Sequence, residues 1–418
     1  MSPQNSQAKL LHNQNFIRIW ISQISSVMAI YIANYALVLN LYKNTSSTLA
    51  ASLLWISYIL PILLVGPMAA TIADLYDKKK ILMVTNLLQA ALMIVLMFVH
   101  ERLFLVYGLV FFYSVINQLY QPAESASLPV LVKKEDLTSA NGLFFLGGQS
   151  GSFVGIAIAG ILFPFIGENI TILVCAALLL LAFISVSGLP KLTQTTHISF
   201  EQGLTDFFDK MGEGYKYIKA NKSVLYAITL IGSITISITL LAVNAPALAD
   251  ELFNISLEKA STLIVLPALL GAVIGILLLT RGSKTKNDQK VVRKRYIIQR
   301  SLMILGLGFL FLSTFIGYLP FSVRNFVVPV VAALIGASAV GIQIPAQTFL
   351  QESTPKHMLG RLMGNVSFMI TLMTVVPLVF SGLVGEFIGA RSFVFLLAVV
   401  CAVGYYLVVR HPDAIDID

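Results

Sequence analysis

The sequence predicts an all-α integral membrane protein, with twelve transmembrane helices in two pseudo-symmetric halves of six helices each. Of its 418 residues, 57% are hydrophobic and only 11% are charged, whereas a soluble protein has about 25% charged residues. The hydrophobic residues lie in runs of about 20, the length that a helix needs to cross a bilayer core of ~30 Å. The runs lack the alternation of a membrane β-barrel, and a helix satisfies its backbone hydrogen bonds within one segment.

Each hydrophobic run is bounded by polar or charged residues, so the spans can be placed one by one. The expected spans are 16–41, 49–73, 81–99, 103–121, 140–165, 169–188, 223–249, 258–280, 297–317, 324–344, 361–384 and 388–409. The first run is too long for the hydrophobic region of a cleavable signal peptide, so we expect it to act as an uncleaved anchor.

The positive charge is distributed unevenly between the loops. With twelve spans, 23 of the 28 lysines and arginines lie on the side that holds both termini, and 5 lie on the other side. Cytoplasmic loops are enriched in lysine and arginine, so both termini are expected in the cytoplasm. The net charge of +8 is then explained by topology, and no nucleic-acid partner is expected.

The chain is expected to consist of three parts. Residues 1–188 form an N-terminal six-helix half, 189–222 a cytoplasmic linker, and 223–418 a C-terminal six-helix half with a short cytoplasmic tail. Identical residues recur at an offset of 210, as in Asn34 and Asn244, and further along at an offset of 223, as in Pro122 and Pro345. These identities indicate that the halves arose by duplication. The linker contains an amphipathic helix that lies on the membrane surface or under the bundle. The alternative is a helix that binds a partner.

The loop between spans 2 and 3 carries a recognisable pattern. Asp74 is followed by the basic run Lys78-Lys79-Lys80, and Ala70 precedes the acid by four positions. This arrangement resembles the signature of the major facilitator superfamily, although Leu75 and Asp77 depart from it. Two parallel six-helix halves with substrate bound between them near the midplane is a known transporter plan.

Span 5 resembles the signature of the antiporter branch of that superfamily, through the spacing of Gly142, Gly151, Gly155 and Gly160. Small residues four apart allow close packing of helices, so these glycines are expected at a helix contact. Further stretches, including Gln121-Pro122-Ala123, are similar to the subfamily that includes macrolide efflux proteins and the enterobactin exporter. The resemblance implies a transporter in a bacterial cytoplasmic (inner) membrane.

The resemblance also implies that the loop is part of a gate. Asp74 and Lys78–Lys80 would lie against the N-terminus of span 11, near Arg361 and Gly364. A carboxylate gains there from the helix dipole and the free N–H groups. The alternative is that the loop only fixes the topology.

Ionisable residues inside a membrane are costly and are functional candidates. The possible proton carriers are Asp250, Glu251 and Glu124, of which the adjacent pair Asp250–Glu251 is the better candidate; for each of them a structural role at a membrane interface is the favoured interpretation. Spans 1, 4, 7 and 10 line the cavity in the resembled superfamily. Candidate cavity residues on these spans are Asn34, Tyr35, Tyr113, Asn117, Gln118, Asn244 and Gln343. Hydrogen bonding between helices is the alternative role for them.

These features predict a secondary active transporter that exports a drug-like or siderophore-like amphiphile by alternating access, with proton antiport. Lipid-like solute transport is one alternative, and a scaffold or sensor that has lost transport is another. The sequence has no pairing of a nucleophile with a base, no metal-ligand cluster and no phosphate-binding loop, so no enzyme activity, cofactor or metal is expected. The expected partners are the substrate, protons and the lipid bilayer, and the expected state is a monomer.

Overall fold

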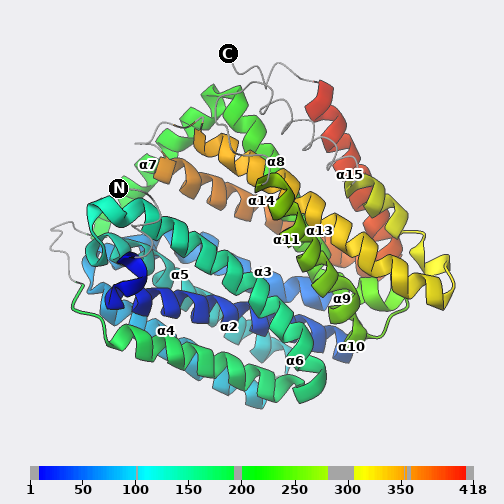
Figure 1. Cartoon of the computed structure of the whole chain (residues 1–418), viewed down its shortest axis with the longest axis horizontal. Helices are drawn as coiled ribbons and strands as arrows, with labels where there is room; N and C mark the ends of the chain where they lie inside the picture. Colours follow the sequence, from blue (N-terminus) through cyan, green and yellow to red (C-terminus); the bar gives the residue numbers. More distant parts are fainter. Residues whose placement is uncertain are drawn as a thin grey trace. The chain divides into compact units, whose positions relative to one another are not determined.

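The computed structural model describes residues 9–99, 102–192, 200–280, 306–352, 354 and 359–410. In these ranges the secondary structure consists of helices, with no strand (Figure 1). Seven of the described helices are long and apolar enough to cross a membrane. The number is eight if the bent pair Ala227–Val243 and Ala245–Leu252 is one span. The all-α membrane fold is therefore confirmed. The first part of predicted span 9, residues 297–305, and the basic residues between 281 and 295 lie outside the described ranges.

The chain divides into two compact units. The first contains Met1–Asn40 and Leu54–Phe208, and the second contains Leu41–Leu53 and Asp209–Asp418. The segment Leu41–Leu53 joins the first two predicted spans, yet it groups with the second unit. The predicted division at 189–222 assigns this segment to the first half.

The first unit is built from five long helices. They are α2 (Gln14–Thr45), α3 (Thr48–Leu75), α4 (Lys78–Val99), α5 (Leu103–Leu131) and α6 (Leu137–Ser187), with a short 3₁₀ turn η1 (Lys134–Asp136) before α6. Helix α4 lies against both α5 and α6. A hydrophobic core joins the helices, and its fully buried members include Phe16, Ile19, Leu82 and Ala123.

Helix α6 contains two predicted spans, 140–165 and 169–188, separated by a kink. Gly167 lies at the kink with φ +73° and ψ 179°. Only glycine adopts such a backbone conformation without a steric cost. The sequence signal for the turn is therefore the glycine between two apolar runs.

The second unit contains more interrupted helices. They are α7 (Phe200–Ala220), α8 (Lys222–Val243), α9 (Ala245–Ala247), η2 (Leu248–Leu252), α10 (Leu257–Ala260), η3 (Ser261–Val265), α11 (Leu266–Thr280), η4 (Ile316–Tyr318), α13 (Phe321–Glu352), α14 (Leu359–Ile388) and α15 (Ala390–Arg410). Residues 306–313 are also helical. Helix α13 lies against α11 and α8, and α14 lies against α8 and α15.

Two predicted spans of this unit are broken near prolines. Span 7 was expected to continue to residue 249, but α8 ends at Val243 and the chain bends by 60° before Ala245. Pro246 follows directly and cannot continue the hydrogen-bond ladder. In span 8 the π-helix η3 ends two residues before Pro267. Proline has no backbone N–H to donate, and its ring clashes with the carbonyl group of the preceding turn. These two effects explain such local changes of helix type.

Helix α7 (Phe200–Ala220) occupies the stretch in which the amphipathic linker helix is expected. Its buried Ile218 packs in a core with Val224, Leu350 and Leu362. The Asn365 Nδ2 on α14 donates a hydrogen bond of 2.9 Å to the carbonyl oxygen of Met211. The C-terminal part of α7 is therefore held by side-chain packing and one polar contact within the second unit.

Candidate functional site

The loop between α3 and α4 is fixed by Asp77, one of the residues that depart from the superfamily pattern. The Asp77 Oδ1 accepts hydrogen bonds from the backbone N–H of Lys79 at 3.0 Å and of Leu192 at 3.2 Å. The first bond is an N-cap of α4, and the second ties the loop to the segment after α6. Lys79 strengthens this tie, since its Nζ donates to the carbonyl oxygen of Leu189 at 2.6 Å.

We expect Asp77→Ala to lower the free energy of unfolding by about 1–2 kcal/mol, because it removes an N-cap and leaves the Leu192 N–H without its acceptor. The matched variant is Asp77→Asn, whose side-chain oxygen still accepts hydrogen bonds and should restore most of the loss. Thermal denaturation of the purified protein in detergent measures both. Equal stability of Asp77→Ala and the wild type would contradict the capping role.

The other gate residues are only partly described. The side chains of Asp74 and Arg361 lie outside the described part of the structure, so the contact of Asp74 with span 11 stays a prediction. Gly364 and Lys80 are exposed. Lys78 is 0% exposed, and within the described residues its Nζ has no hydrogen-bond partner. In the sequence, nothing distinguishes Lys78 from Lys79 and Lys80.

The glycines of α6 form a close contact with α2. A Cβ added at Gly155 would lie 3.0 Å from the Met28 carbonyl oxygen and 3.2 Å from its Cα. A Cβ at Gly151 would lie 3.3 Å from a methyl group of Val27. Gly147, one turn earlier, faces the Trp20 side chain of α2. The four-residue spacing of Gly147, Gly151 and Gly155 is the sequence signal that identifies Gly147 as a further packing residue.

The remaining two predicted packing glycines differ from these. Gly160 is buried. Gly142 is exposed, and a Cβ added there would meet no atom within 4 Å. The predicted role of Gly142 in helix packing is therefore wrong for this conformation. Gly142 is the first glycine of the superfamily pattern, but it lies outside the contact between α6 and α2.

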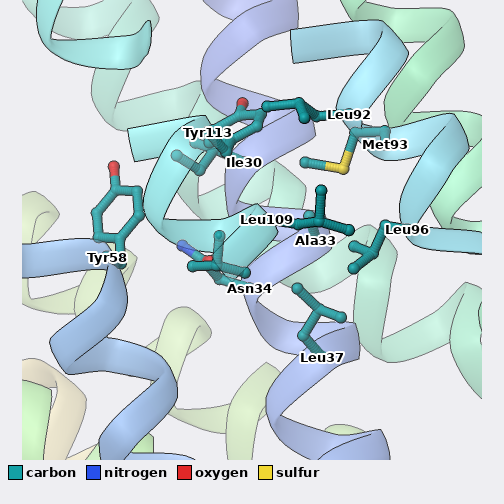
Figure 2. A pocket seen from close by; sticks show the side chains of 11 residues that line it. Ile30, Ala33, Asn34, Leu37, Tyr58, Leu92, Met93, Leu96, Leu109 and Tyr113 are labelled. Atoms are coloured by element: carbon teal, nitrogen blue, oxygen red, sulfur yellow. The ribbon is translucent and has the colours of Figure 1, made fainter. Parts of the chain in front are cut away.

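A small cavity in the first unit brings together two of the predicted cavity residues. Asn34 on α2 and Tyr113 on α5 both line it, together with Tyr58 on α3. Figure 2 shows the Asn34 amide and the two tyrosine rings on one side, with Leu92, Met93 and Leu96 of α4 opposite. The remaining lining residues are Ile30, Ala33, Leu37, Leu109 and Val110.

The cavity is small and its lining is neutral. Its volume is about 20 Å³, which is room for about one water molecule. A drug-sized ligand therefore needs the lining helices to separate. Tyr58 is not among the predicted cavity residues, because it belongs to span 2 and the cavity was expected to be lined by spans 1, 4, 7 and 10.

Two further candidates on α5 are engaged in hydrogen bonds inside the first unit. Asn117 accepts a bond of 3.4 Å from the Gln89 Nε2, and Gln118 donates one of 3.4 Å to the carbonyl oxygen of Ser114. Tyr35 on α2 is half-buried. These residues lie on the helices that line the cavity, but they are not among its lining residues.

The two candidates in the second unit have different surroundings. Asn244 is 1% exposed and ends α8 as its C-cap. Its Nδ2 donates to the carbonyl oxygen of Leu240 at 2.9 Å and to the Ser381 hydroxyl at 3.3 Å. The bond to Ser381 joins α8 to α14, as expected from the alternative role in interhelical hydrogen bonding. Gln343 is half-buried on α13.

The acidic pair at the end of the bent span 7 is exposed. The side chains of Asp250 and Glu251 are both exposed. Glu251 accepts hydrogen bonds from the Tyr42 hydroxyl at 3.1 Å and from the backbone N–H of Ala390 at 3.0 Å. Since Ala390 is the first residue of α15, this carboxylate caps the helix N-terminus. These two hydrogen bonds indicate a structural role for Glu251.

Glu124 on α5 is the buried carboxyl group among the three candidates. It is 8% exposed, and its Oε1 accepts a hydrogen bond of 2.9 Å from the Tyr120 hydroxyl. Tyr120 is one helical turn away on the same face. The Tyr120 hydroxyl also lies 3.0 Å from the Ser22 hydroxyl of α2.

Apolar helices of membrane-spanning length, with a neutral aromatic cavity and a buried carboxyl group inside them, define a multi-pass membrane transport protein. The sequence profile of the Major Facilitator Superfamily matches residues 19–376. The chain belongs to this superfamily and is a transporter, not an enzyme.

Two named relatives and two solved structures illustrate the relationship. Macrolide efflux protein A of Streptococcus pyogenes is 28% identical over 409 residues, covering 92% of this chain and 95% of the relative. The MFS-type transporter YfiS of Bacillus subtilis is 23% identical, with 86% and 84% coverage. The nucleoside transporter NupG has a TM-score of 0.68 at 12% identity, covering 96% of this chain and 99% of NupG. The POT family transporter PepTSo has a TM-score of 0.67 at 13% identity, with 97% and 99% coverage. At these identities the two structures show the fold alone.

Proposed function

We propose that the protein exports a drug-like or siderophore-like amphiphile from a bacterial cytoplasm by alternating access, driven by proton antiport. The observation that carries this proposal is the similarity to macrolide efflux protein A over nearly the full length of both chains. The neutral lining of the cavity supports an amphiphile over a small ion, because an ion would need charged groups or a ring of carbonyl ligands. The excess of basic residues in one set of loops supports cytoplasmic termini.

In this mechanism Asn34, Tyr58 and Tyr113 contact the substrate once the lining helices separate. The tyrosine rings offer apolar faces with a polar tip, and the amide both donates and accepts hydrogen bonds. The hairpin with Asp74 closes the cytoplasmic side against the start of α14, where Arg361 and Gly364 lie.

The proposal is tested by flux in proteoliposomes that contain the purified full chain. An imposed pH gradient should drive transport of erythromycin, a fluorescent dye or an iron-free siderophore, and an uncoupler should abolish it. Flux that is independent of the gradient would contradict antiport. The absence of flux for the whole panel would favour a scaffold or sensor.

We expect Asn34→Leu to raise the KM for the transported compound by about two- to tenfold, because a lost hydrogen bond costs about 0.5–1.5 kcal/mol. The variant keeps a similar volume, so protein yield and thermal stability should stay near wild type. Leu37→Met on the same wall of the cavity is the matched control, since it conserves volume and apolar character. An unchanged KM in Asn34→Leu would exclude the amide from substrate contact.

A further inference from the structure

A continuous hydrogen-bond network connects three helices of the first unit around Glu124. The Ser26 hydroxyl on α2 donates to the Asn86 Oδ1 on α4 at 3.0 Å. The Asn86 Nδ2 donates to the Ser22 hydroxyl oxygen at 3.3 Å. The Ser22 hydroxyl lies 3.0 Å from that of Tyr120, which donates to Glu124 on α5. We call these five residues the Glu124 network.

The donors of the Glu124 network all point toward the carboxyl group. Tyr120 has a single hydroxyl hydrogen and gives it to Glu124, so Ser22 must donate to Tyr120. Asn86 in turn donates to Ser22. An ionised carboxylate accepts the Tyr120 hydrogen bond, and so does the carbonyl oxygen of a protonated carboxyl group, so the contact holds Glu124 in either charge state.

The network is buried among apolar side chains. Ser22 and Asn86 are 0% exposed and Tyr120 is 3% exposed. Tyr120 belongs to the hydrophobic core that contains Phe16, Ile19 and Leu82. An ionised carboxylate in such surroundings costs several kcal/mol unless it is paired or accepts a proton.

No cation in the described structure neutralises Glu124. The charged side chains on α2 and α4 are Arg18 and Lys43 on α2, with Lys43 at the opposite end of α2 from Ser22, and Lys78–Lys80 on α4. Arg18 and Lys79 donate to backbone carbonyl oxygens, Lys80 is exposed, and the Lys78 Nζ has no hydrogen-bond partner. The first part of α6, up to Gly167, has no charged residue. Tyr120 is the one donor to Glu124 among the described residues.

The same helices hold the network and line the cavity. Ser22 and Ser26 precede Ile30 and Asn34 on α2, Asn86 precedes Leu92 and Met93 on α4, and Tyr113 precedes Tyr120 on α5. A change in the hydrogen bonds of the network therefore acts on elements that form the cavity walls.

We infer that Glu124 is the proton-binding site of this transporter, and that Tyr120, Ser22, Asn86 and Ser26 transmit its charge state to α2 and α4. The inference rests on the proposed proton antiport. One proton from water bonds to the carboxylate and gives a neutral carboxyl group, with no electron transfer. Protonation removes the negative charge that the Tyr120 hydrogen bond stabilises and adds an O–H donor at Glu124, so the hydrogen bonding of the Glu124 network changes. Release of the proton restores the carboxylate.

The test measures proton binding directly by infrared difference spectroscopy on the reconstituted full chain at acid and alkaline pH. The carbonyl stretching band of a protonated carboxyl should titrate in the wild type and be lost in Glu124→Gln. The band should persist in Glu251→Gln, which removes the other hydrogen-bonded candidate. Tyr120→Phe should displace the midpoint of the titration, because it removes the donor to the carboxylate.

A band that persists in Glu124→Gln, or one that disappears in Glu251→Gln, would overturn the inference. If Glu124→Gln does not fold, Tyr120→Phe decides, and an unchanged midpoint would reject the site. Proton release driven by erythromycin is measured in parallel. Loss of the band in Glu124→Gln without any erythromycin-driven release would refute the proposed substrate or coupling while leaving the proton site in place.

Discussion

Gly155→Leu should abolish transport and strongly reduce the yield of folded protein. The Cβ alone would lie 3.0–3.2 Å from backbone atoms of Met28, and backbone cannot rotate away as a side chain can. The leucine would force α2 and α6 apart. Overpacking of a tight contact costs about 1–3 kcal/mol and sometimes more. Size-exclusion profiles and thermal denaturation in detergent measure the folding defect, and efflux from cells measures transport.

Gly142→Leu is the matched control for this variant. It places the same side chain on the same helix where no atom lies within 4 Å, so folding and transport should stay near wild type. If both variants fail equally, the defect comes from replacing glycine in α6 and not from the contact with α2.

Lys78→Met should raise the free energy of unfolding by about 2 kcal/mol. The Lys78 side chain is fully buried, and its Nζ has no hydrogen-bond partner in the described part of the chain. Methionine has a similar shape and carries no charge to desolvate, and replacing buried charge by apolar groups often stabilises by about 1–4 kcal/mol. The measurement is the midpoint of thermal or denaturant unfolding in detergent.

Lys80→Met in the same first turn of α4 is the control, because Lys80 is exposed and should change stability by less than about 0.5 kcal/mol. A loss of stability in Lys78→Met would mean that the ammonium group has a stabilising role. Reduced transport with raised stability would indicate that the charge is needed in another conformation of the transport cycle.

Hydrophobic runs predicted most of the helices because a bilayer allows few other structures. Helices α2, α3, α4, α14 and α15 agree with their expected spans within a few residues. The differences arise where local backbone chemistry decides. Helix α5 continues through Pro122 and Pro129 to Leu131, ten residues beyond the predicted span, because apolar and small residues follow the prolines.

The candidate site was less predictable, since it depends on contacts between helices. The pairing of Tyr120 with Glu124 has a sequence signal, because residues four apart share a helix face. The partners Ser22 and Asn86 come from other helices, and nothing in the sequence connects them. The preference for Asp250 and Glu251 rested on two adjacent acids, a pattern that does not reveal their exposure or the helix cap that Glu251 forms.

The placement of Leu41–Leu53 has a consequence for attempts to separate the halves. The Thr48 hydroxyl donates to the carbonyl oxygen of Gly382 at 2.9 Å, and the Ser47 hydroxyl donates to Glu386 at 2.8 Å. A fragment that ends at residue 188 would contain the segment Leu41–Leu53 but not its hydrogen-bond partners on α14. Gene fragments divided at the linker should therefore complement each other only when co-expressed.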